Sequence, residues 1–355
     1  MLKVFDQNHK PSGTLYKYED FHIDSDLDTG DKKLSLKVVY GDMPVCEGYL
    51  QTKSDEYVVK NVKSRSGTVD AVLNLEALEG TPFQSFSISE KSIQYGIGQA
   101  LDGTGWSLGE CEIPETDLRN AGMIDCDALA VINNLCAVWM CEPEFKTLTK
   151  TVNIYKKRGR DRGVYFASGF NLREVEVEYD SYDFYTQIVP QGADDLDITE
   201  VNGGKNYLEN FQYSTKKKVF VWKDESYTDA AALMEDAEAY LEDLSQPAVS
   251  YDCDVIDLAK QSKKYDVLSY GLGDIVTVID AKTKSRVKQR IVAISEYPGQ
   301  PQKNKCTLSS RRPRFTDLLD KRKNAESIEV YDVTGGKLGV TTLSKIIAEL
   351  KASNG

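Results

Sequence analysis

Three aspartates at alternate positions, Asp24, Asp26 and Asp28, form the stretch of the sequence that most resembles a metal-binding motif. Carboxylates at this spacing are typical of a calcium loop, which also needs Gly at its sixth position and Glu at its twelfth. Those two positions hold Thr29 and Ser35. We therefore interpret the run as a solvated turn between strands, with a calcium loop as the alternative.

A second acidic cluster, Asp194, Asp195 and Asp197, lies in the stretch "GADDLDI". No Glu follows at the spacing that a bidentate calcium ligand needs. The motif "NGGK" at 202–205 comes next, and its Asn-Gly-Gly composition favours positive φ angles and a tight reversal. A structural corner is the preferred interpretation here too.

The residues that could act as nucleophiles or bases are few and scattered. Only two histidines are present, His9 and His22, and no HExxH motif includes them. Cys136 and Cys141 flank the end of an expected helix and are interpreted as core thiols. The Gly-rich stretch at 96–110 contains neither GxGxxG nor GxxxxGK[ST], so it does not predict a phosphate cradle.

Paired carboxylates for glycoside hydrolysis stay open as an alternative, because 56 acidic residues guarantee chance pairs. Glu174, Glu176 and Glu178 alternate with apolar residues and are better explained as the wet face of a half-buried strand whose other face carries Val175, Val177 and Tyr179. We expect no catalytic residue, no bound metal and no cofactor.

Two surface features are candidate interaction sites. The stretch "KKRGRDRG" at 156–163 forms a positive tip, with its densest part at 156–162, on an expected hairpin between "LTKTVNIYKK" and "GVYFASGF". It would suit an acidic partner or phosphates, or it is simply a soluble turn. The aromatic residues Tyr179, Tyr182, Phe184 and Tyr185 could stack on sugars, or serve packing or a subunit interface.

Bulk composition limits the class of protein. The 355 residues are 41% hydrophobic and 28% charged, which is typical of a globular chain of two to three domains. The net charge of −12 argues against general DNA binding driven by neutralisation of the phosphates. No leader sequence or membrane span is expected. The seven cysteines, without a CxxC pair, indicate reduced thiols made in a cytoplasm.

The fold class expected from the chain is α+β, β-rich and multidomain. A first β module is expected at 1–92, a mixed α+β module at 93–190, and a connecting segment at 191–247. A second β module is expected at 248–312, followed by a charged connector and a C-terminal helix at 313–355. That last helix would present Leu343, Ile346, Ile347 and Leu350 on one face.

Two internal helices carry clear signals. In the first, Asp125 or Asp127 can act as the N-cap, and one apolar face contains Ala128, Ile132, Leu135 and Trp139. The second is expected at 229–244, with Thr228 as its N-cap and Pro247 beyond its end. Its apolar stripe consists of Leu233, Ala237, Tyr240, Leu241 and Leu244.

The stretch at 145–210, with its basic turn, "GFNL", Gly-Ala-Asp corner and "NGGKNYLEN", resembles the central signature of phage tail-tip proteins. These are the Tal or prophage tail endopeptidase family, also called minor structural proteins. The corner departs from the family pattern, because Asp195 and Asp197 replace the usual Gly and Thr. "LDGTGWSLG" and "GLGDIVTVID" extend the resemblance to about 20–310.

The resemblance implies a baseplate hub of the myophage type, in which two barrel-like modules per chain form a pseudo-six-fold ring in a homotrimer. Such a ring closes the tail tube, contacts the distal tail and tape measure proteins, and lets DNA pass only as cargo. Receptor-binding or cell-wall-degrading tail proteins are further expected partners. The Gly-Ala-Asp corner and the "NGGK" turn would lead the chain from the mixed module back to the ring.

The expected location is the virion tail tip, after assembly in the bacterial cytoplasm and without stable membrane insertion. The endopeptidase activity of longer relatives is not carried over to this chain, which is interpreted as non-enzymatic. A tail-associated peptidoglycan hydrolase and a carbohydrate-binding adhesion module are the alternatives.

Overall fold

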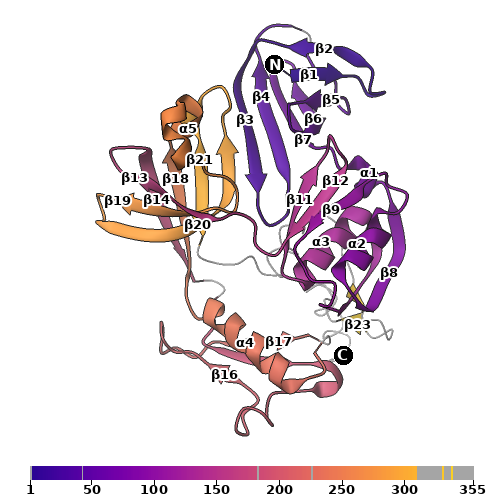
Figure 1. The fold of residues 1–355 in the computed structure, drawn as a ribbon, viewed down its shortest axis with the longest axis vertical. Coiled ribbons are helices and arrows are strands. Elements are labelled where there is room, and N and C mark those ends of the chain that lie inside the picture. Colours follow the sequence, from indigo (N-terminus) through magenta and orange to yellow (C-terminus); the bar gives the residue numbers. More distant parts are fainter. Residues whose placement is uncertain are drawn as a thin grey trace, which may run out of the picture.

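A computed structural model describes residues 2–41, 43–181, 184–224 and 227–309, together with the backbone of β22 (Val330–Tyr331) and β23 (Lys337–Leu338). Strands dominate and helices are few (Figure 1), which confirms the β-rich prediction. The helix expected near 341–351 lies outside the described residues. A single 13-stranded sheet runs through two β modules, and two smaller α/β modules are attached to it.

The first β module contains seven antiparallel strands in the order β3-β4-β7-β6-β5-β1-β2. Alternation of apolar and polar residues determines which face is buried: Leu34, Leu36 and Val38 of β4 point into the core, and Ser35 and Lys37 between them do not. The strands are β1 (Leu2–Phe5), β2 (Pro11–Leu15), β3 (Tyr18–Asp26), β4 (Lys32–Val38), β5 (Tyr49–Gln51), β6 (Glu56–Lys63) and β7 (Thr68–Leu73).

The second β module is built from two separate parts of the chain, one before and one after the small α/β module. Its strand order is β13-β19-β20-β21-β18-β14, and its buried side chains form a core of their own. The strands are β13 (Asp161–Ala167), β14 (Leu172–Asp180), β18 (Ala248–Val255), β19 (Ile275–Asp280), β20 (Ser285–Glu296) and β21 (Lys305–Ser309). Short helical turns, α5 (Leu258–Gln261), η2 (Lys263–Leu268) and η3 (Pro301–Lys303), connect them.

The prediction of a hairpin around the basic tip is wrong. Its first strand, β12 (Thr151–Tyr155), pairs with β11 (Glu142–Lys146) and β9 (Ser107–Cys111) of the mixed module. Its second strand, β13, pairs in parallel with β19 of the second β module. The basic stretch is therefore a crossover between two modules. Local alternation predicts that both segments are strands, but it contains no information about which partners they choose.

The two β modules share one pairing pattern. Strands β3, β4, β5, β6 and β7 correspond in chain order to β14, β18, β19, β20 and β21, and each set is joined in the same antiparallel sequence of neighbours. In the first set the ladder between β6 and β7 shifts between Val59 and Asn61. In the second set the ladder between β20 and β21 shifts between Ile291 and Ala293. A bulge thus occupies the same place in both modules.

The backbone bonds beside this bulge are also repeated. Just before β5, the Val59 N–H donates to the Gly48 carbonyl at 2.8 Å and the Val59 carbonyl accepts from the Glu47 N–H at 2.7 Å. Just before β19, the Ile291 N–H donates to the Asp274 carbonyl at 2.9 Å and the Ile291 carbonyl accepts from the Gly273 N–H at 2.9 Å. Such agreement at the level of single hydrogen bonds identifies an internal structural repeat.

The mixed module packs three helices against short sheets, and its core is continuous with that of the first β module. Helix α3 begins after Asp127, whose carboxylate accepts from the Ala130 N–H at 2.7 Å, so Asp127 is the cap of the two candidates. The elements are β8 (Pro82–Lys91), β9 (Ser107–Cys111), β10 (Arg119–Asp127), β11 (Glu142–Lys146) and β12, with α1 (Glu76–Glu79), α2 (Ile93–Leu101) and α3 (Ala128–Val138).

Helix α2 was not expected, because its two internal glycines resemble a loop. One of them has a packing reason. A Cβ on Gly96 would lie 2.9 Å from Ile88 Cδ1 and 3.0 Å from Leu135 Cδ1. The helix can approach β8 and α3 this closely only without a side chain at that position.

The small module is inserted between β14 and β18. Helix α4 (Ala230–Leu244) buries Leu233, Ala237, Leu241 and Leu244 as expected, against the sheet of β15 (Gln187–Gln191), β16 (Leu208–Glu209) and β17 (Val219–Lys223). The Gly-Ala-Asp corner, which includes η1 (Ala193–Asp195), and the "NGGK" turn both lie between β15 and β16. They reverse the chain inside this module, so the prediction that they lead it from the mixed module back to the ring is wrong; the chain returns to the second β module through α4 and β18.

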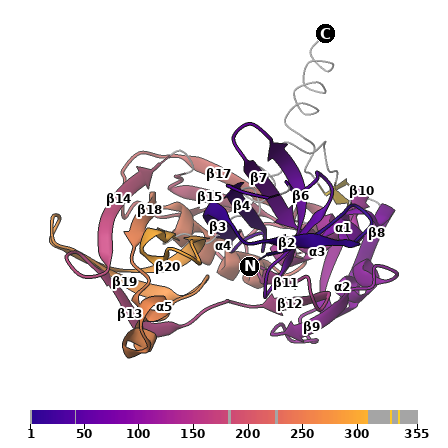
Figure 2. The same cartoon turned by 90° about the horizontal axis from the view of Figure 1, so that it is seen from above.

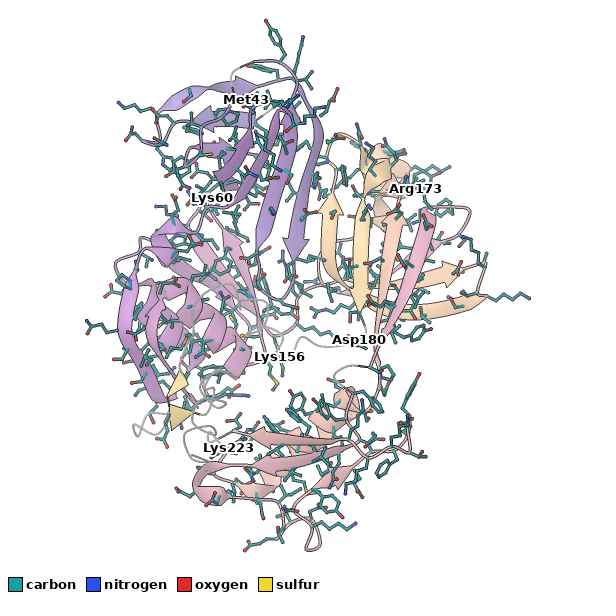
Figure 3. The ribbon with its side chains drawn as sticks, turned by 180° about the vertical axis from the view of Figure 1, so that it is seen from behind. Met43, Lys60, Lys156, Arg173, Asp180 and Lys223 are labelled. Atoms are coloured by element: carbon teal, nitrogen blue, oxygen red, sulfur yellow. The ribbon has the colours of Figure 1, made fainter. Side chains whose placement is uncertain are left out.

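Figure 1 shows the mixed module below the first β module and the small module at the bottom, and Figure 2 shows the second β module and the mixed module at opposite sides of the molecule. The end of β14 at Asp180 lies beside the small module (Figure 3). No helix within the described residues is both long enough and apolar enough to cross a membrane.

The N-cap of α4 gives a direct test of the fold. Asp229, not the expected Thr228, caps the helix, with its Oδ1 2.8 Å from the Ala232 N–H. Asp229→Ala should lower the local stability of α4 by about 1 kcal/mol, since an N-cap bond is lost. Amide hydrogen exchange in α4 should then become about fivefold faster. Thr228→Ala is the control and should leave the exchange rates unchanged; equal effects of both substitutions would contradict the assignment.

Candidate functional site

The two β modules meet at a seam between β3 and β20. Strand β20 pairs with β19 through Ser285–Arg290 and then, further along, with the last residues of β3. Asp24 lies opposite Ser295, whose Oγ donates to the Asp24 carboxylate at 2.5 Å. The Leu27 N–H donates to the carbonyl of the bulge residue Val292 at 2.9 Å. Backbone pairing therefore joins two separately cored modules into one sheet.

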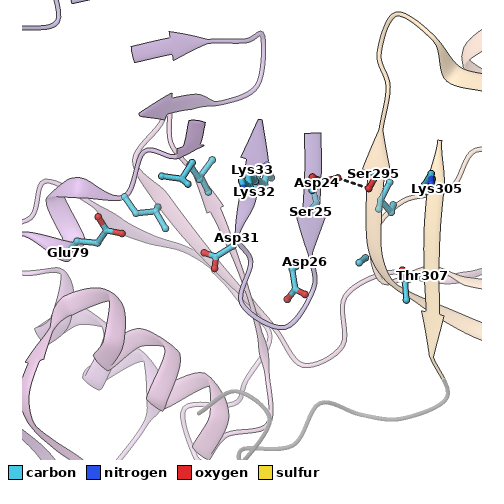
Figure 4. Close-up of a pocket in the computed structure, with 15 residues that line it drawn as sticks. Asp24, Ser25, Asp26, Asp31, Lys32, Lys33, Glu79, Ser295, Lys305 and Thr307 are labelled. Atoms are coloured by element: carbon cyan, nitrogen blue, oxygen red, sulfur yellow. Dashed lines mark hydrogen bonds between the residues drawn. The ribbon is translucent and has the colours of Figure 1, made fainter. Parts of the chain in front are cut away.

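A groove of about 510 Å³ follows this seam (Figure 4). Two of its lysines pair with carboxylates that do not line it: the Lys32 Nζ lies 2.6 Å from Asp55 Oδ2, and the Lys305 Nζ lies 3.7 Å from Asp254. Burial raises the pKa of Glu79. Neighbouring carboxylates raise this pKa further, whereas Lys60 lowers it. Among the described residues no three His, Cys, Asp or Glu side chains converge as metal ligands would. Lys32 and Lys305 of the groove are therefore already paired with carboxylates.

The acidic run 24–28 belongs to this seam. Asp24 binds Ser295, whereas the Asp26 carboxylate accepts from the Asp28 and Thr29 N–H groups at 3.0 and 3.1 Å and so closes the β3–β4 turn. The turn interpretation is confirmed, but the turn is not solvated throughout. Leu27 is fully buried, and a Cβ on Gly30 would lie 2.9 Å from the Pro143 carbonyl. The turn rests on the mixed module.

The second acidic cluster lies in the small module, far along the chain from this seam. Asp194 and Asp195 adopt positive φ angles of 51° and 60°, and Asp197 accepts from the Thr199 N–H at 2.8 Å. Gly203 and Gly204 have φ angles of 60° and 87°, which confirms the tight reversal at "NGGK". These residues make turns.

The histidines and cysteines do not form a nucleophile pair in the described residues. His9 stacks on Tyr49 and lies 3.0 Å from Glu56, whereas His22 stacks on Tyr297. Cys136 and Cys141 are buried as expected, and the contact with Cys136 together with burial raises the pKa of Cys141. Burial also raises the pKa of the Cys253 thiol to about 12. Such thiols remain protonated and unreactive at neutral pH.

The aromatic cluster is divided between two modules. Tyr179 follows Val175 and Val177 on the same face of β14, as the sequence pattern indicated, but its side chain is 68% exposed. Phe184 is buried in the small module, where Tyr185 packs on Phe220. Tyr182 lies outside the described residues. The described members therefore do not form one sugar-binding platform.

The charged side chains of β14 point to solvent, as expected. Glu174, Glu176 and Glu178 are exposed. Asp254 lies opposite Glu174, and Asp252 lies opposite Glu176. Like charges directly opposite one another destabilise a strand pair. The outer face of β14 and β18 is thus a negative stripe, offset in part by Arg173 and Lys305, which lie near Asp254.

The basic stretch 156–162 connects the mixed module to the second β module, and we call it the clasp. Figure 3 shows Lys156 at its start, between the modules. The carboxylate of Glu142 on β11 accepts hydrogen bonds from both terminal nitrogens of Arg290 on β20, at 2.5 and 2.6 Å. It also accepts from the Arg158 N–H at 2.7 Å. The Arg158 side chain in turn binds Glu144 at 2.5 Å. Part of the positive charge expected on a free tip is therefore used inside the junction.

Two glycines let the clasp approach β19. Gly159 and Gly273 have φ angles of 82° and 87°. A Cβ on Gly159 would lie 2.1 Å from the Gly273 carbonyl carbon, and one on Gly273 would lie 2.4 Å from the Arg158 oxygen. Beyond this contact the Arg160 N–H donates to the buried Asp274 at 2.7 Å. Glu142, Asp274 and Arg290 were not predicted from the sequence, in which the only local signals of this contact are Gly159 and Gly273.

Comparison with known proteins agrees with the resemblance. Residues 160–319, which include all strands of the second β module and the small module, match the prophage endopeptidase tail family. No curated protein sequence matches the chain significantly. The resemblance to phage tail proteins expected from the sequence is thus confirmed.

Three crystal structures share the fold over nearly the whole chain. Prophage tail protein gp18 from Listeria monocytogenes EGD-e aligns with a TM-score of 0.60 at 14% identity, covering 91% of this chain and 98% of that one. The 43 kDa tail protein of prophage MuSo2 from Shewanella oneidensis gives 0.59 at 10% identity, covering 88% and 98%. A tail protein from Neisseria meningitidis MC58 gives 0.58 at 10% identity, covering 87% and 96%.

The Glu142–Arg290 pair allows a test of the junction. Replacing one partner, as in Arg290→Met, should destabilise the protein by about 3–5 kcal/mol, because the other charge is left buried without a counterion. The double variant Glu142→Gln with Arg290→Met should recover part of this loss in denaturant unfolding. Lys288→Ala is a control: it removes an exposed pair with Asp161 at 2.8 Å and should change stability by about 1 kcal/mol or less. An Arg290→Met variant as stable as that control would contradict this assignment.

The glycine contact makes a second prediction. Gly159→Ala introduces both a left-handed alanine and a backbone clash, whereas Gly163→Ala introduces only the first, since nothing lies within 4 Å of the added Cβ. Gly163→Ala should destabilise by about 1–2 kcal/mol and Gly159→Ala by clearly more. Thermal unfolding of both variants measures the difference, and equal losses would show that the close approach is not required.

Proposed function

We propose that the protein is a structural component of the tail tip or baseplate of a tailed phage or a prophage-derived particle. The internal repeat is the observation that supports a hub role most directly. A ring protein with two related modules per chain presents two similar positions from each copy. The family match and the shared fold of three phage tail proteins point to the same kind of particle.

In this proposal the two β modules act as barrel-like bodies, and three copies place six of them around a channel. The ring would continue and close the tail tube, with the distal tail and tape measure proteins as neighbours. Other tail proteins that bind receptors or degrade the cell wall would attach further out. The virion tail would be its location, after assembly in the host cytoplasm, which suits a chain whose described cysteines are all free thiols.

Charge supports a passage for DNA without retention. The chain carries a net charge of −12, and β14 and β18 carry a solvent-facing negative stripe. Phosphates are repelled by such a surface, whereas a basic wall would hold the duplex through counterion release. DNA would pass as cargo.

A tail-associated peptidoglycan hydrolase is the second candidate, because the matched family carries an endopeptidase description. The described residues favour the structural role. Their histidines are engaged by aromatic rings, and burial raises the pKa values of several thiols. Peptidoglycan fragments released by the purified chain would support the hydrolase instead.

Mass and shape test the hub proposal. Light scattering should give three times the chain mass of 39.7 kDa, and negative-stain images should show a ring with a central channel. Trimerisation should persist in high salt if backbone pairing and apolar contacts dominate it. A chain that stays monomeric at every concentration, or a trimer without a channel, would count against the ring.

A further inference from the structure

We infer that neighbouring copies of the chain join by antiparallel pairing of β14 of one copy with the C-terminal end of β6 of the next, with Lys63 opposite Glu178. This inference rests on the proposed ring. It follows from the internal repeat: the seam inside each chain shows how one module adds to the other, and the same rule specifies the contact between chains.

The first step concerns which strand edges are used. In the seam within the chain, β20 pairs with β19 and then extends past it, and this extension receives β3. Its counterpart β6 pairs with β5 only through Glu56–Val58 and extends to Lys63. The counterpart of β3 is β14, which within the described residues pairs with β18 alone. The chain therefore contains this pair of complementary edges twice. The edges of β20 and β3 are paired with each other, whereas those of their counterparts β6 and β14 are not.

The second step gives the register on β6. The bulge makes Val59 equivalent to Ile291, as the shared ladder shift and the shared hydrogen bonds show. Ser295 comes four residues after Ile291, and Lys63 comes four residues after Val59. Lys63 is therefore the counterpart of Ser295.

The third step gives the register on β14. Strands β3 and β14 each have nine residues, and each begins opposite the last residue of its neighbour, Val38 or Val255. Both ladders contain one shift in their first half. Asp24 and Glu178 are each the seventh residue of their strand. The observed pair Asp24–Ser295 thus corresponds to Glu178–Lys63 between copies.

Exposure distinguishes the joined edge from the unjoined one. Ala293 and Ser295, which β3 covers, are half-buried, whereas their counterparts Asn61 and Lys63 are exposed. On the other strand Asp24 is half-buried and Glu178 is exposed. Figure 3 shows Lys60 and Arg173, which mark β6 and β14, at opposite margins of the β modules. The two free edges therefore face away from each other, so one copy cannot close on itself.

The side chains at the inferred contact are complementary. Lys63 would meet Glu178, an opposite-charge pair at directly opposed positions. Val62 would contact Tyr179. This contact would cover the Tyr179 side chain, which is 68% exposed in the single chain. Within the described part of the chain, no hydrogen bond or ion pair engages the side chain of Lys63 or of Glu178. The negative stripe of β14 gains a cation at its free edge.

Geometry permits closure. The path from β14 through β18, β21, β20, β3, β4 and β7 to β6 contributes eight strands per copy, so three copies make a wall of 24 strands. At a strand spacing of about 4.8 Å and a tilt of about 45°, such a wall measures about 50 Å across between backbones. Sheets of 16–18 strands already enclose a water-filled channel, so this one leaves a wide bore. Closure also removes the long free edges that otherwise invite aggregation.

Disulfide trapping tests the register. Lys63→Cys with Glu178→Cys, in a Cys46→Ser background that removes an exposed thiol, should form a link between chains on mild oxidation, because directly opposed strand residues have the Cα separation a disulfide needs. Non-reducing gels should show linked dimers and trimers, and mass spectrometry should identify the 63–178 linkage. As a positive control, Asp24→Cys with Ser295→Cys should link within one chain.

Lys63→Cys with Glu174→Cys is the register control, since four residues of displacement move the second thiol about 13 Å along the strand. It should link weakly or not at all. Equal linkage of both pairs, or absence of the 63–178 link, would overturn the inferred contact. The mass separates the two possible failures: a trimer without the link refutes this interface alone, and a monomer without the link removes the proposed ring as well.

Charge reversal supplies an independent readout. Lys63→Glu and Glu178→Lys should each weaken association of the chains about tenfold, and the two together should restore it, because the pair is re-formed with its signs exchanged. A merely structural effect of either substitution would not be rescued by the other. Additive loss in the double variant would overturn the inference.

Discussion

Unpaired backbone groups at the margin of a sheet must find partners, and the pairing of β3 with the extended end of β20 meets this requirement within the chain. Without it the two β modules would be separate bodies, each with its own core. A groove lined by residues of both modules follows the seam. The junction is held by backbone bonds and, on the side of the mixed module, by the clasp with its buried Glu142–Arg290 pair. Registration of strands is therefore the constraint from which the arrangement of modules follows.

The repeat also shows which properties of a sequence a strand ladder preserves. Leu34 and Tyr251 occupy equivalent positions, as do Val69 and Cys306, and all four are buried despite their different chemistry. Burial and alternation are kept, whereas identity is not, because a half-buried strand needs apolar volume on one face and little else. The first strands differ more: β1 runs antiparallel to β5, whereas β13 runs parallel to β19.

Local signals in the sequence predicted most elements, and they failed where partners are distant. Alternation identified the strands, and the apolar stripe of α4 was correct because helix periodicity is a property of neighbouring residues. The hairpin at 156–162 was wrong because a strand pattern does not name its partner, and Glu142 and Arg290 are 148 positions apart. Helix α2 was missed because Gly96 serves packing against Leu135, a contact that no local rule contains. The cap of α4 was misplaced by one residue, as Thr228 and Asp229 are both good caps.

Strands β3 and β14 are equivalent, and both point toward the α/β modules. The turn after β3 rests on Pro143 of the mixed module, and the chain after β14 enters the small module directly. In a closed assembly the α/β modules of all copies would therefore lie at one end of the ring, and the other end would have none. Such an object has a polarity: whatever stacks on it meets two chemically different ends, so a particle built upon it can grow in one sense only.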